Sequence, residues 1–323
     1  MWQHVTLLAL GLFFLWKGSD VAVTSATKLA DKYGISQTLV GLTILSVGTS
    51  LPEIFTNIYS GIQVAKGVDA SGVAVGTIIG SEVGQITLVL GVTGLVGSMR
   101  CDAETLRRDG SMMLIAVAAM FLCCLDGHVS QVEGALLCAT YIGYLLFLAH
   151  TTSVVKTIAD SAQADAQPQI RTGVEIIRVV GGLAVLLIGT KLGVDNAVAI
   201  APELGISQSM VGIFIIGVGT SLPELSIAVA GVRNKAAAVS LGALIGSNIT
   251  DPLLSLGAGA SIAGFDADKS LLRFDIPFWL LATLIALMLL RRGGGIGKGQ
   301  RIEGALLISL FALFTVLKLS FDW

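Results

Sequence analysis

The chain has 323 residues, of which 54% are hydrophobic and only 13% are charged, and its mean hydropathy is +0.85. Soluble domains carry roughly 25% charged residues, so this composition excludes an ordinary soluble protein and indicates a polytopic membrane protein. The net charge of −2 and the lack of a basic patch give no support to nucleic-acid binding. No Ser–His–Asp, Cys–His or HExxH arrangement is present in the sequence, which argues against an enzyme.

Ten apolar runs are long enough to cross a bilayer, which takes roughly 20 residues each. They cover approximately residues 3–31, 35–64, 70–97, 110–125, 131–149, 173–201, 206–231, 236–262, 272–290 and 302–320. The longest polar segment between them follows the fifth run. We therefore expect an all-α polytopic membrane protein with a five-helix repeat at 1–150, a cytoplasmic linker at 151–172 and a second five-helix repeat at 173–323.

One stretch of the chain occurs twice. Residues 34–53, GISQTLVGLTILSVGTSLPE, return as residues 205–224, GISQSMVGIFIIGVGTSLPE, with 14 of 20 positions identical at an offset of 171. Gly18 and Gly189 share that offset, so we expect the apolar amino-terminal segment to belong to the repeat and to be retained. Because each half has an odd number of spans, the second copy must cross the membrane in the opposite direction. Inverted repeats are typical of transporters and occur in channels too.

Basic residues are unevenly distributed over the predicted loops. If the amino terminus lies outside, the inner loops hold most of the lysines and arginines, whereas the outer loops hold little more than Lys66, Lys269 and Lys318. Basic residues accumulate on the cytoplasmic side of membrane proteins. We therefore expect a multi-pass protein of the cell membrane with both termini outside.

A glutamate ends each copy of the repeated stretch, Glu53 in the first and Glu224 in the second. Both lie in apolar segments with no lysine or arginine nearby. A carboxylate in such a position is costly, and it marks a candidate functional site. A proline kink beside a buried, protonated glutamate is the alternative, but a kink alone would not need to be duplicated.

The residues before each glutamate supply further oxygen atoms. Pro52 and Pro223 lack the N–H that would pair with the carbonyl four residues earlier, so that carbonyl needs a cation or water as a partner. Thr49 and Thr220 each stand four residues before the glutamate and share its helix face. Carboxylate, hydroxyl and carbonyl oxygens together suit hard cations, calcium above all.

A second pair of matching segments follows at an offset of 166, GTIIGSEVGQ at 76–85 and GALIGSNITD at 242–251. In each, a serine stands four residues before an acid or amide, so Ser81 with Gln85 and Ser247 with Asp251 offer oxygens from a second helix. The glycines of the first half recur every four residues, which predicts close helix packing; they are Gly72, Gly76, Gly80 and Gly84.

These doubled motifs resemble the two alpha repeats of the cation/calcium antiporter superfamily, most closely its prokaryotic sodium/calcium exchangers, over nearly the whole chain. The resemblance implies ten helices, with the first and sixth sliding as a gate to give alternating access. It implies calcium coordination by Glu53, Glu224 and the carbonyls of Thr49 and Thr220. It also implies flanking sodium sites formed with the help of polar side chains, namely Ser50, Ser81, Gln85, Ser221, Ser247 and Asp251.

The first half departs from the family pattern. Gly-Ser-Asn-x-x-Asn is usual where this chain has Gly-Ser-Glu82-Val-Gly-Gln85, so Glu82 takes the position that Asn248 holds in the second half. Gln85 keeps a carbonyl oxygen but reaches one methylene further than asparagine. Glu82 and Asn248 are therefore candidates for selectivity or protonation. Three readings of Glu82 stay open: a side chain turned away from the ions, a proton-titrating group, or an added cation ligand.

The leading hypothesis is a secondary antiporter that exchanges calcium for sodium at carboxylates near the membrane midplane. A proton/calcium or potassium-dependent antiporter is the alternative, and a cation channel is the alternative from another class. The expected partners are calcium, sodium, in the alternative protons, and the lipid bilayer. We expect no cofactor besides the transported ions. The oligomeric state is open, with a monomer as the simplest case.

Overall fold

The structure, a computed structural model, describes residues 2–99, 101–160, 171–200, 219, 221–267, 271–291 and 301–320. The first half consists of α1 (Trp2–Tyr33), α2 (Gln37–Val40), the π-helical turn η1 (Gly41–Leu45), α3 (Ser46–Thr49), α4 (Leu51–Ala65), α5 (Ser71–Val83), the π-helical turn η2 (Gly84–Val89), α6 (Leu90–Val96), α7 (Ala103–Cys123) and α8 (Gln131–Asp160). The second half consists of α9 (Thr172–Ile200), α12 (Leu222–Arg233), α13 (Ala237–Thr250), η5 (Asp251–Ser255), α14 (Leu256–Ala263), η6 (Leu271–Asp275), α15 (Ile276–Arg291) and α16 (Arg301–Ser320).

Helices lie at all ten predicted spans, although the first part of the seventh falls outside the described residues. The boundaries differ at two places. α7 begins earlier than predicted because the Asp102 carboxylate caps it, accepting a hydrogen bond of 2.7 Å from the Thr105 amide. α8 continues past 149 to Asp160, so a helix occupies the first part of the segment predicted as a linker.

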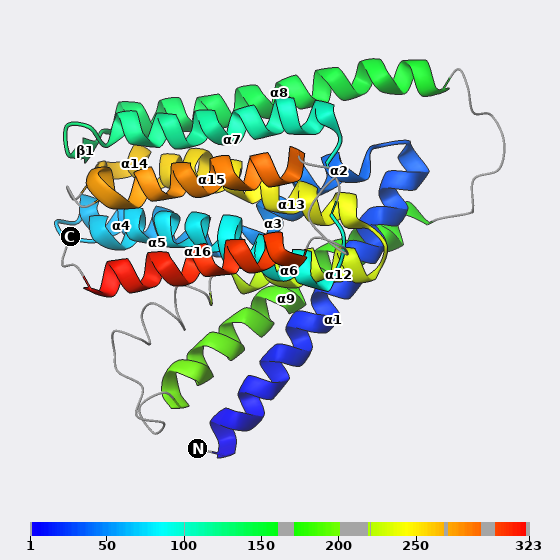
Figure 1. The fold of residues 1–323 in the computed structure, drawn as a ribbon, viewed down its shortest axis with the longest axis horizontal. Coiled ribbons are helices and arrows are strands. Elements are labelled where there is room, and N and C mark those ends of the chain that lie inside the picture. The colour runs from blue at the N-terminus through cyan, green and yellow to red at the C-terminus, as the bar shows by residue number, and fades with distance from the viewer. Residues whose placement is uncertain are drawn as a thin grey trace.

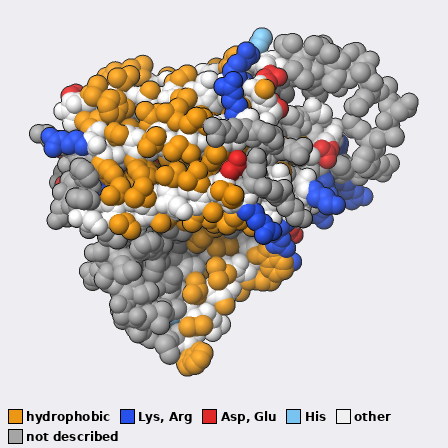
Figure 2. All heavy atoms as spheres, in the orientation of Figure 1, with side chains coloured by type: hydrophobic (Ala, Val, Ile, Leu, Met, Phe, Trp, Pro, Cys, Tyr) orange, Lys and Arg blue, Asp and Glu red, His pale blue; other side chains and the backbone are white. Residues whose placement is uncertain are grey.

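The membrane character of the chain is evident from its helices and its surface. Six described helices are long and apolar enough to span a bilayer, and the pair Gln37–Thr49 and Leu51–Ala65, bent by 48°, makes a seventh. Large apolar side chains such as Phe55, Leu146 and Ile302 are more than 60% exposed. Figure 2 shows apolar side chains over the middle of one face, with Lys and Arg at its edges. Such a surface fits lipid rather than water.

The first helix of each half packs against the other, side by side and oblique to the remaining helices (Figure 1). A Cβ placed on Gly11 of α1 would lie 2.6 Å from the Gly193 nitrogen of α9, and one on Gly18 would lie 2.6 Å from the Leu186 nitrogen. Residue numbers on α9 therefore fall as those on α1 rise, so the helices are antiparallel. Matching helices of opposite direction are what an inverted repeat requires.

Polar contacts join α1 and α9 near both ends. The His4 Nδ1 lies 2.8 Å from the Asn196 Oδ1. At the other end, the Lys28 Nζ lies 3.8 Å from the Glu175 carboxylate, which also accepts a hydrogen bond of 2.9 Å from Arg178. The two helices are thus connected along their length and form one unit.

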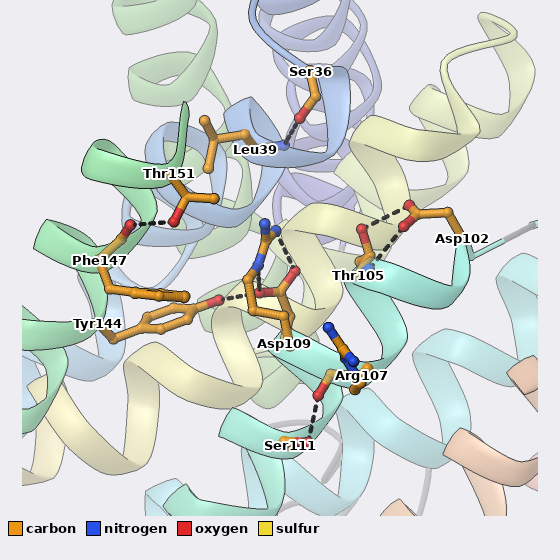
Figure 3. A network of polar contacts seen from close by, with 11 residues as sticks. Ser36, Leu39, Asp102, Thr105, Arg107, Asp109, Ser111, Tyr144, Phe147 and Thr151 are labelled. Carbon is orange, nitrogen blue, oxygen red and sulfur yellow. Dashed lines mark hydrogen bonds and ion pairs between the residues drawn. The ribbon is translucent and has the colours of Figure 1, made fainter. Parts of the chain in front are cut away.

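The other helices stack in layers beside this unit, with α7 and α8 forming one outer layer (Figure 1). Asp109 of α7 is fully buried, and its carboxylate accepts hydrogen bonds from Arg108 at 2.6 and 2.8 Å and from the Tyr144 hydroxyl of α8 at 2.9 Å (Figure 3). At the far end of the layer, β1 (His128–Val129) pairs antiparallel with β2 (Phe265–Asp266). The Asp109 contacts join α7 to α8, and the strand pair attaches this layer to the second half.

The predicted packing of the first-half glycines is tested only at Gly84, where an added Cβ would lie 3.5 Å from the Ser221 Oγ. No described atom lies within 4 Å of a Cβ built at the other three. Their second-half counterparts Gly242 and Gly246 do pack closely, against Thr38 and Ser46. The repeat positions of Thr38 and Ser46 are 209 and 217, which lie outside the described residues.

A Gly18→Ala substitution is expected to destabilise the protein by about 1–3 kcal/mol, because the new methyl group overlaps the α9 backbone. Gly143→Ala is the control, since no described atom lies within 4 Å of a Cβ there. Thermal unfolding in detergent measures both. Equal melting temperatures for Gly18→Ala and Gly143→Ala would contradict the close contact of α1 with α9.

Candidate functional site

Each glutamate of the repeated stretch stands in the first turn of a helix that follows a break. α3 ends at Thr49, Ser50 leaves the helical conformation with φ −77° and ψ 2°, and α4 begins at Leu51. Glu53 is therefore the third residue of α4, and Glu224 is likewise the third residue of α12. Helix amino termini carry partial positive charge and favour carboxylates.

The prolines of the two hexads occupy the second position of α4 and α12. A first-turn proline loses no intrahelical hydrogen bond, so Pro52 and Pro223 start new helices rather than kink continuous ones. The carbonyls of Gly48 and Gly219 still lack the N–H donor four residues later, as the sequence predicts.

Glu53, Glu224 and Asp251 are at most 1% exposed and lie close enough to interact electrostatically with one another. The Ser81 hydroxyl is 3.4 Å from both the Glu53 Oε1 and the Asp251 Oδ2. The structure therefore brings acids from both halves into one buried region. We call Glu53, Glu224, Asp251 and Ser81 the central cluster.

Hydroxyl groups join the broken span of the first half to α13 and η5 of the second. The Thr49 Oγ1 lies 3.4 Å from the Ser247 Oγ, and the Ser46 Oγ lies 2.9 Å from the Thr250 Oγ1. Further along, the Asn57 Nδ2 donates to the Ser255 Oγ at 3.1 Å. Ser46, Thr250, Asn57 and Ser255 were not singled out from the sequence.

Several fully buried oxygens of this region have no hydrogen-bond partner among the described residues: Ser50 Oγ, Glu53 Oε2, Ser221 Oγ, both Glu224 oxygens and Asp251 Oδ1. The hydroxyls of Ser50 and Thr49 lie near Asp251 and Glu224 respectively, without meeting hydrogen-bond geometry. No described lysine, arginine or histidine forms an ion pair with the three acids. Buried charges without a partner are strongly unfavourable, so these oxygens need a cation or protons.

The acids do not form a compact metal cluster. No group of three His, Cys, Asp or Glu side chains in the described part of the chain is arranged to hold one ion. In this arrangement, a bound cation would be coordinated by at most two carboxylates, and hydroxyl and carbonyl oxygens would complete its coordination shell. Calcium, with six to eight oxygen ligands of mixed kind, accepts such an environment.

Two amide side chains border the central cluster. The Gln85 Nε2 donates to the Ser81 Oγ at 2.8 Å and to the Asp251 Oδ2 at 3.0 Å. The Gln85 Oε1 accepts from the Asn248 Nδ2 at 2.9 Å, and the same nitrogen donates to the Leu244 carbonyl at 2.8 Å. Gln85 thus presents N–H groups to the cluster, where the sequence suggested a carbonyl oxygen.

Glu82 is fully buried on α5, and neither of its oxygens has a hydrogen-bond partner in the described part of the chain. Its carboxyl lies near the Trp279 indole of α15 without hydrogen-bond geometry, and it interacts electrostatically with Asp251 and Glu224. The side chain is therefore turned towards α15 yet remains within electrostatic range of the central cluster.

The remaining predicted site residue, Thr220, lies outside the described residues. What sequence reasoning missed is a set of π-helical turns: η1 precedes the first hexad, η2 contains Gln85 and η5 contains Asp251. Single π-helical turns are frequent at functional sites. The proline after Asp251, Pro252, is the one sequence signal that could have indicated η5.

Comparison with known proteins gives consistent results. The model of the sodium/calcium exchanger protein family matches residues 3–149 and 174–320. Sodium/calcium exchanger MaX1 of Methanosarcina acetivorans is 30% identical over 96% of this chain and 97% of its own, and inner membrane protein YrbG of Escherichia coli is 31% identical over 95% and 96%. A solved structure of the sodium-calcium exchanger NCX_Mj, soaked with Na⁺ and Ca²⁺, matches with a TM-score of 0.80 and 26% identity over 98% of both chains.

Glu53→Gln and Glu224→Gln are each expected to raise the melting temperature in chelator-containing buffer. Without bound calcium, burying an uncharged amide at either position costs about 1–3 kcal/mol less free energy than burying a carboxylate that has no partner. Glu104→Gln, on the exposed first turn of α7, is the control and is expected to match the wild type. Differential scanning fluorimetry in detergent measures the shift. A lower melting temperature for both site variants would mean that the two carboxylates already have stabilising partners.

Proposed function

The chain belongs to the sodium/calcium exchanger protein family, and from this premise we propose that it exchanges Ca²⁺ for Na⁺ across the membrane. It is a multi-pass membrane protein of a transporter family rather than of an enzyme family. The observation that carries the proposal is the set of buried oxygens that both halves contribute to the central cluster and that have no hydrogen-bond partner among the described residues. The names of the relatives MaX1 and NCX_Mj support the choice of ions.

In the proposed site, Ca²⁺ binds between Glu53 and Glu224 near the membrane midplane, with the carbonyls of Thr49 and Thr220 completing its shell. Sodium ions take flanking positions formed by the remaining polar residues of the site, Ser50, Ser81, Ser221, Ser247 and Asp251. The burial of the described side chains in this set supports the assignment, and so does the absence of an ion pair between its acids and a basic residue in the described part of the chain.

Exchange follows from competition for these oxygens. Bare carboxylates are too costly to cross the low-dielectric interior, so the site changes its accessible side only when one ion type or the other occupies it. The unit of α1 and α9, connected near both ends, is the element that we propose to slide as the gate. The halves at 1–150 and 173–323 then work as inverted repeats, with a cytoplasmic linker at 151–172 and both termini outside.

A proton/calcium antiporter is the second candidate, because Glu82 adds a fourth buried carboxyl within electrostatic range of the site. Glu82→Asn restores the asparagine that the second half carries at this position. If protons drive transport through Glu82, the variant is expected to lose pH-driven calcium uptake. If sodium drives transport, Glu82→Asn is expected to retain sodium-driven uptake.

Purified protein in proteoliposomes is expected to take up radioactive calcium when an outward sodium gradient is imposed. The control vesicles have equal sodium on both sides. Calcium uptake that is independent of the sodium gradient but driven by a pH gradient would show that the protein is a proton/calcium antiporter. Calcium flux with no counter-ion requirement, together with open-pore currents, would select a channel.

Glu53→Gln and Glu224→Gln are each expected to reduce calcium exchange by at least about a hundredfold. Each substitution removes one carboxylate that would pair with the buried Ca²⁺, and breaking a buried charge pair costs about 3–5 kcal/mol. Glu104→Gln is the matched control and is expected to keep full exchange. Initial rates of radioactive calcium uptake measure the effect. Wild-type rates in both site variants would remove these glutamates from the transport site.

A further inference from the structure

The amides of Asn248 and Gln85 have only one consistent orientation. The Leu244 carbonyl can only accept a hydrogen bond, so the atom of Asn248 that lies 2.8 Å from it must be the nitrogen. That nitrogen has two hydrogens, and the second points to the Gln85 side chain 2.9 Å away. The facing atom of Gln85 must therefore be its oxygen.

The orientation of Gln85 determines what it offers to the central cluster. With its oxygen directed at Asn248, its nitrogen faces Ser81 and Asp251, and both hydrogens are used at 2.8 and 3.0 Å. The reverse orientation would place the Gln85 oxygen against the Asp251 carboxylate and two NH₂ groups against each other. A backbone carbonyl of α13 thus controls, through two amides, the polarity of the group beside Asp251.

We propose that Asn248 holds Gln85 as a hydrogen-bond donor to Asp251, so that the flank of the site between Gln85 and Asp251 excludes cations. The N–H groups of Gln85 act there as the partner of the Asp251 carboxylate, in the place where a carbonyl ligand would attract sodium. This inference rests on the proposed function, because it specifies how many flanking positions the exchange site offers to Na⁺. Asn248 is a positioning residue and Gln85 a specificity-determining one.

We call the contact by which Asn248 orients Gln85 the relay, and it has no equivalent at the matching described positions of the other repeat. The counterpart of Asn248 in the first half is Glu82, and the counterpart of Gln85 is Asp251. Neither Glu82 oxygen has a hydrogen-bond partner in the described part of the chain, so Glu82 does not orient Asp251 as Asn248 orients Gln85. Asn248 of the second half therefore orients Gln85 of the first, the described residues hold no matching contact from Glu82 to Asp251, and the two flanks of the site differ.

The test measures binding of radioactive Ca²⁺ to purified protein in detergent, and its displacement by Na⁺, at constant pH. In Asn248→Ala, Gln85 is free to turn its oxygen towards the cluster and to supply one more ligand. Half-displacement of Ca²⁺ is then expected at about tenfold lower Na⁺, with a steeper curve, because the turned amide adds an oxygen ligand for the cation, worth about 1.4 kcal/mol. Asn248→Leu, which keeps the side-chain volume, serves if Asn248→Ala does not fold.

The decisive control is the same substitution in a Gln85→Met background, which keeps the length of the side chain but removes the amide. If Asn248 acts only through Gln85, then Asn248→Ala has no further effect on Na⁺ displacement in that background. An equal shift in both backgrounds would overturn the proposal, as would an unchanged displacement curve in Asn248→Ala alone.

Failure of the proposed function gives a different result. If wild-type protein binds Ca²⁺ and Na⁺ does not displace it, sodium coupling is wrong. The relay is then tested by the Ca²⁺ titration itself, because the additional Gln85 oxygen in Asn248→Ala is expected to lower the half-saturating Ca²⁺ concentration. An unchanged Ca²⁺ midpoint in that case would overturn the relay as well.

Discussion

Burial of the Glu53, Glu224 and Asp251 carboxylates without a basic partner in the described part of the chain is the constraint on which the rest of the structure depends. An unpaired charge inside a protein or membrane is costly, and no packing of apolar side chains offsets it. The surrounding features reduce that cost. Both glutamates stand in the first turn of a helix, where backbone dipoles favour negative charge, and the Ser81 hydroxyl lies between Glu53 and Asp251.

The repeat explains why the acids meet. Two copies of one unit, running in opposite directions, bring Glu53 and Glu224 into one buried region, and the broken span of the first half lies against α13 of the second. The antiparallel contact of α1 with α9 follows from the same inversion. The two halves depart from symmetry above all at one pair of matching positions, where the first half has Glu82 and the second has Asn248.

Much of this could be predicted from the sequence because its signals are local and repeated. The doubled hexad marks both helix breaks and both glutamates, and the odd number of spans per half requires the inversion. Sequence patterns could not determine side-chain orientation. Gln85 has one methylene more than asparagine, but this does not show which end of its amide faces the site. That orientation depends on Asn248, on another helix, whose own amide is oriented by the Leu244 carbonyl. The π-helical turns and the contact of Ser46 with Thr250 likewise depend on tertiary packing.

The most direct test of the central claim is an anomalous difference map from crystals of the protein soaked in Ca²⁺. The account predicts one peak with oxygens of both Glu53 and Glu224 within about 2.3–2.6 Å, the usual range for calcium ligands. A map in which calcium contacts only one of these two glutamates, or lies away from both, would contradict it.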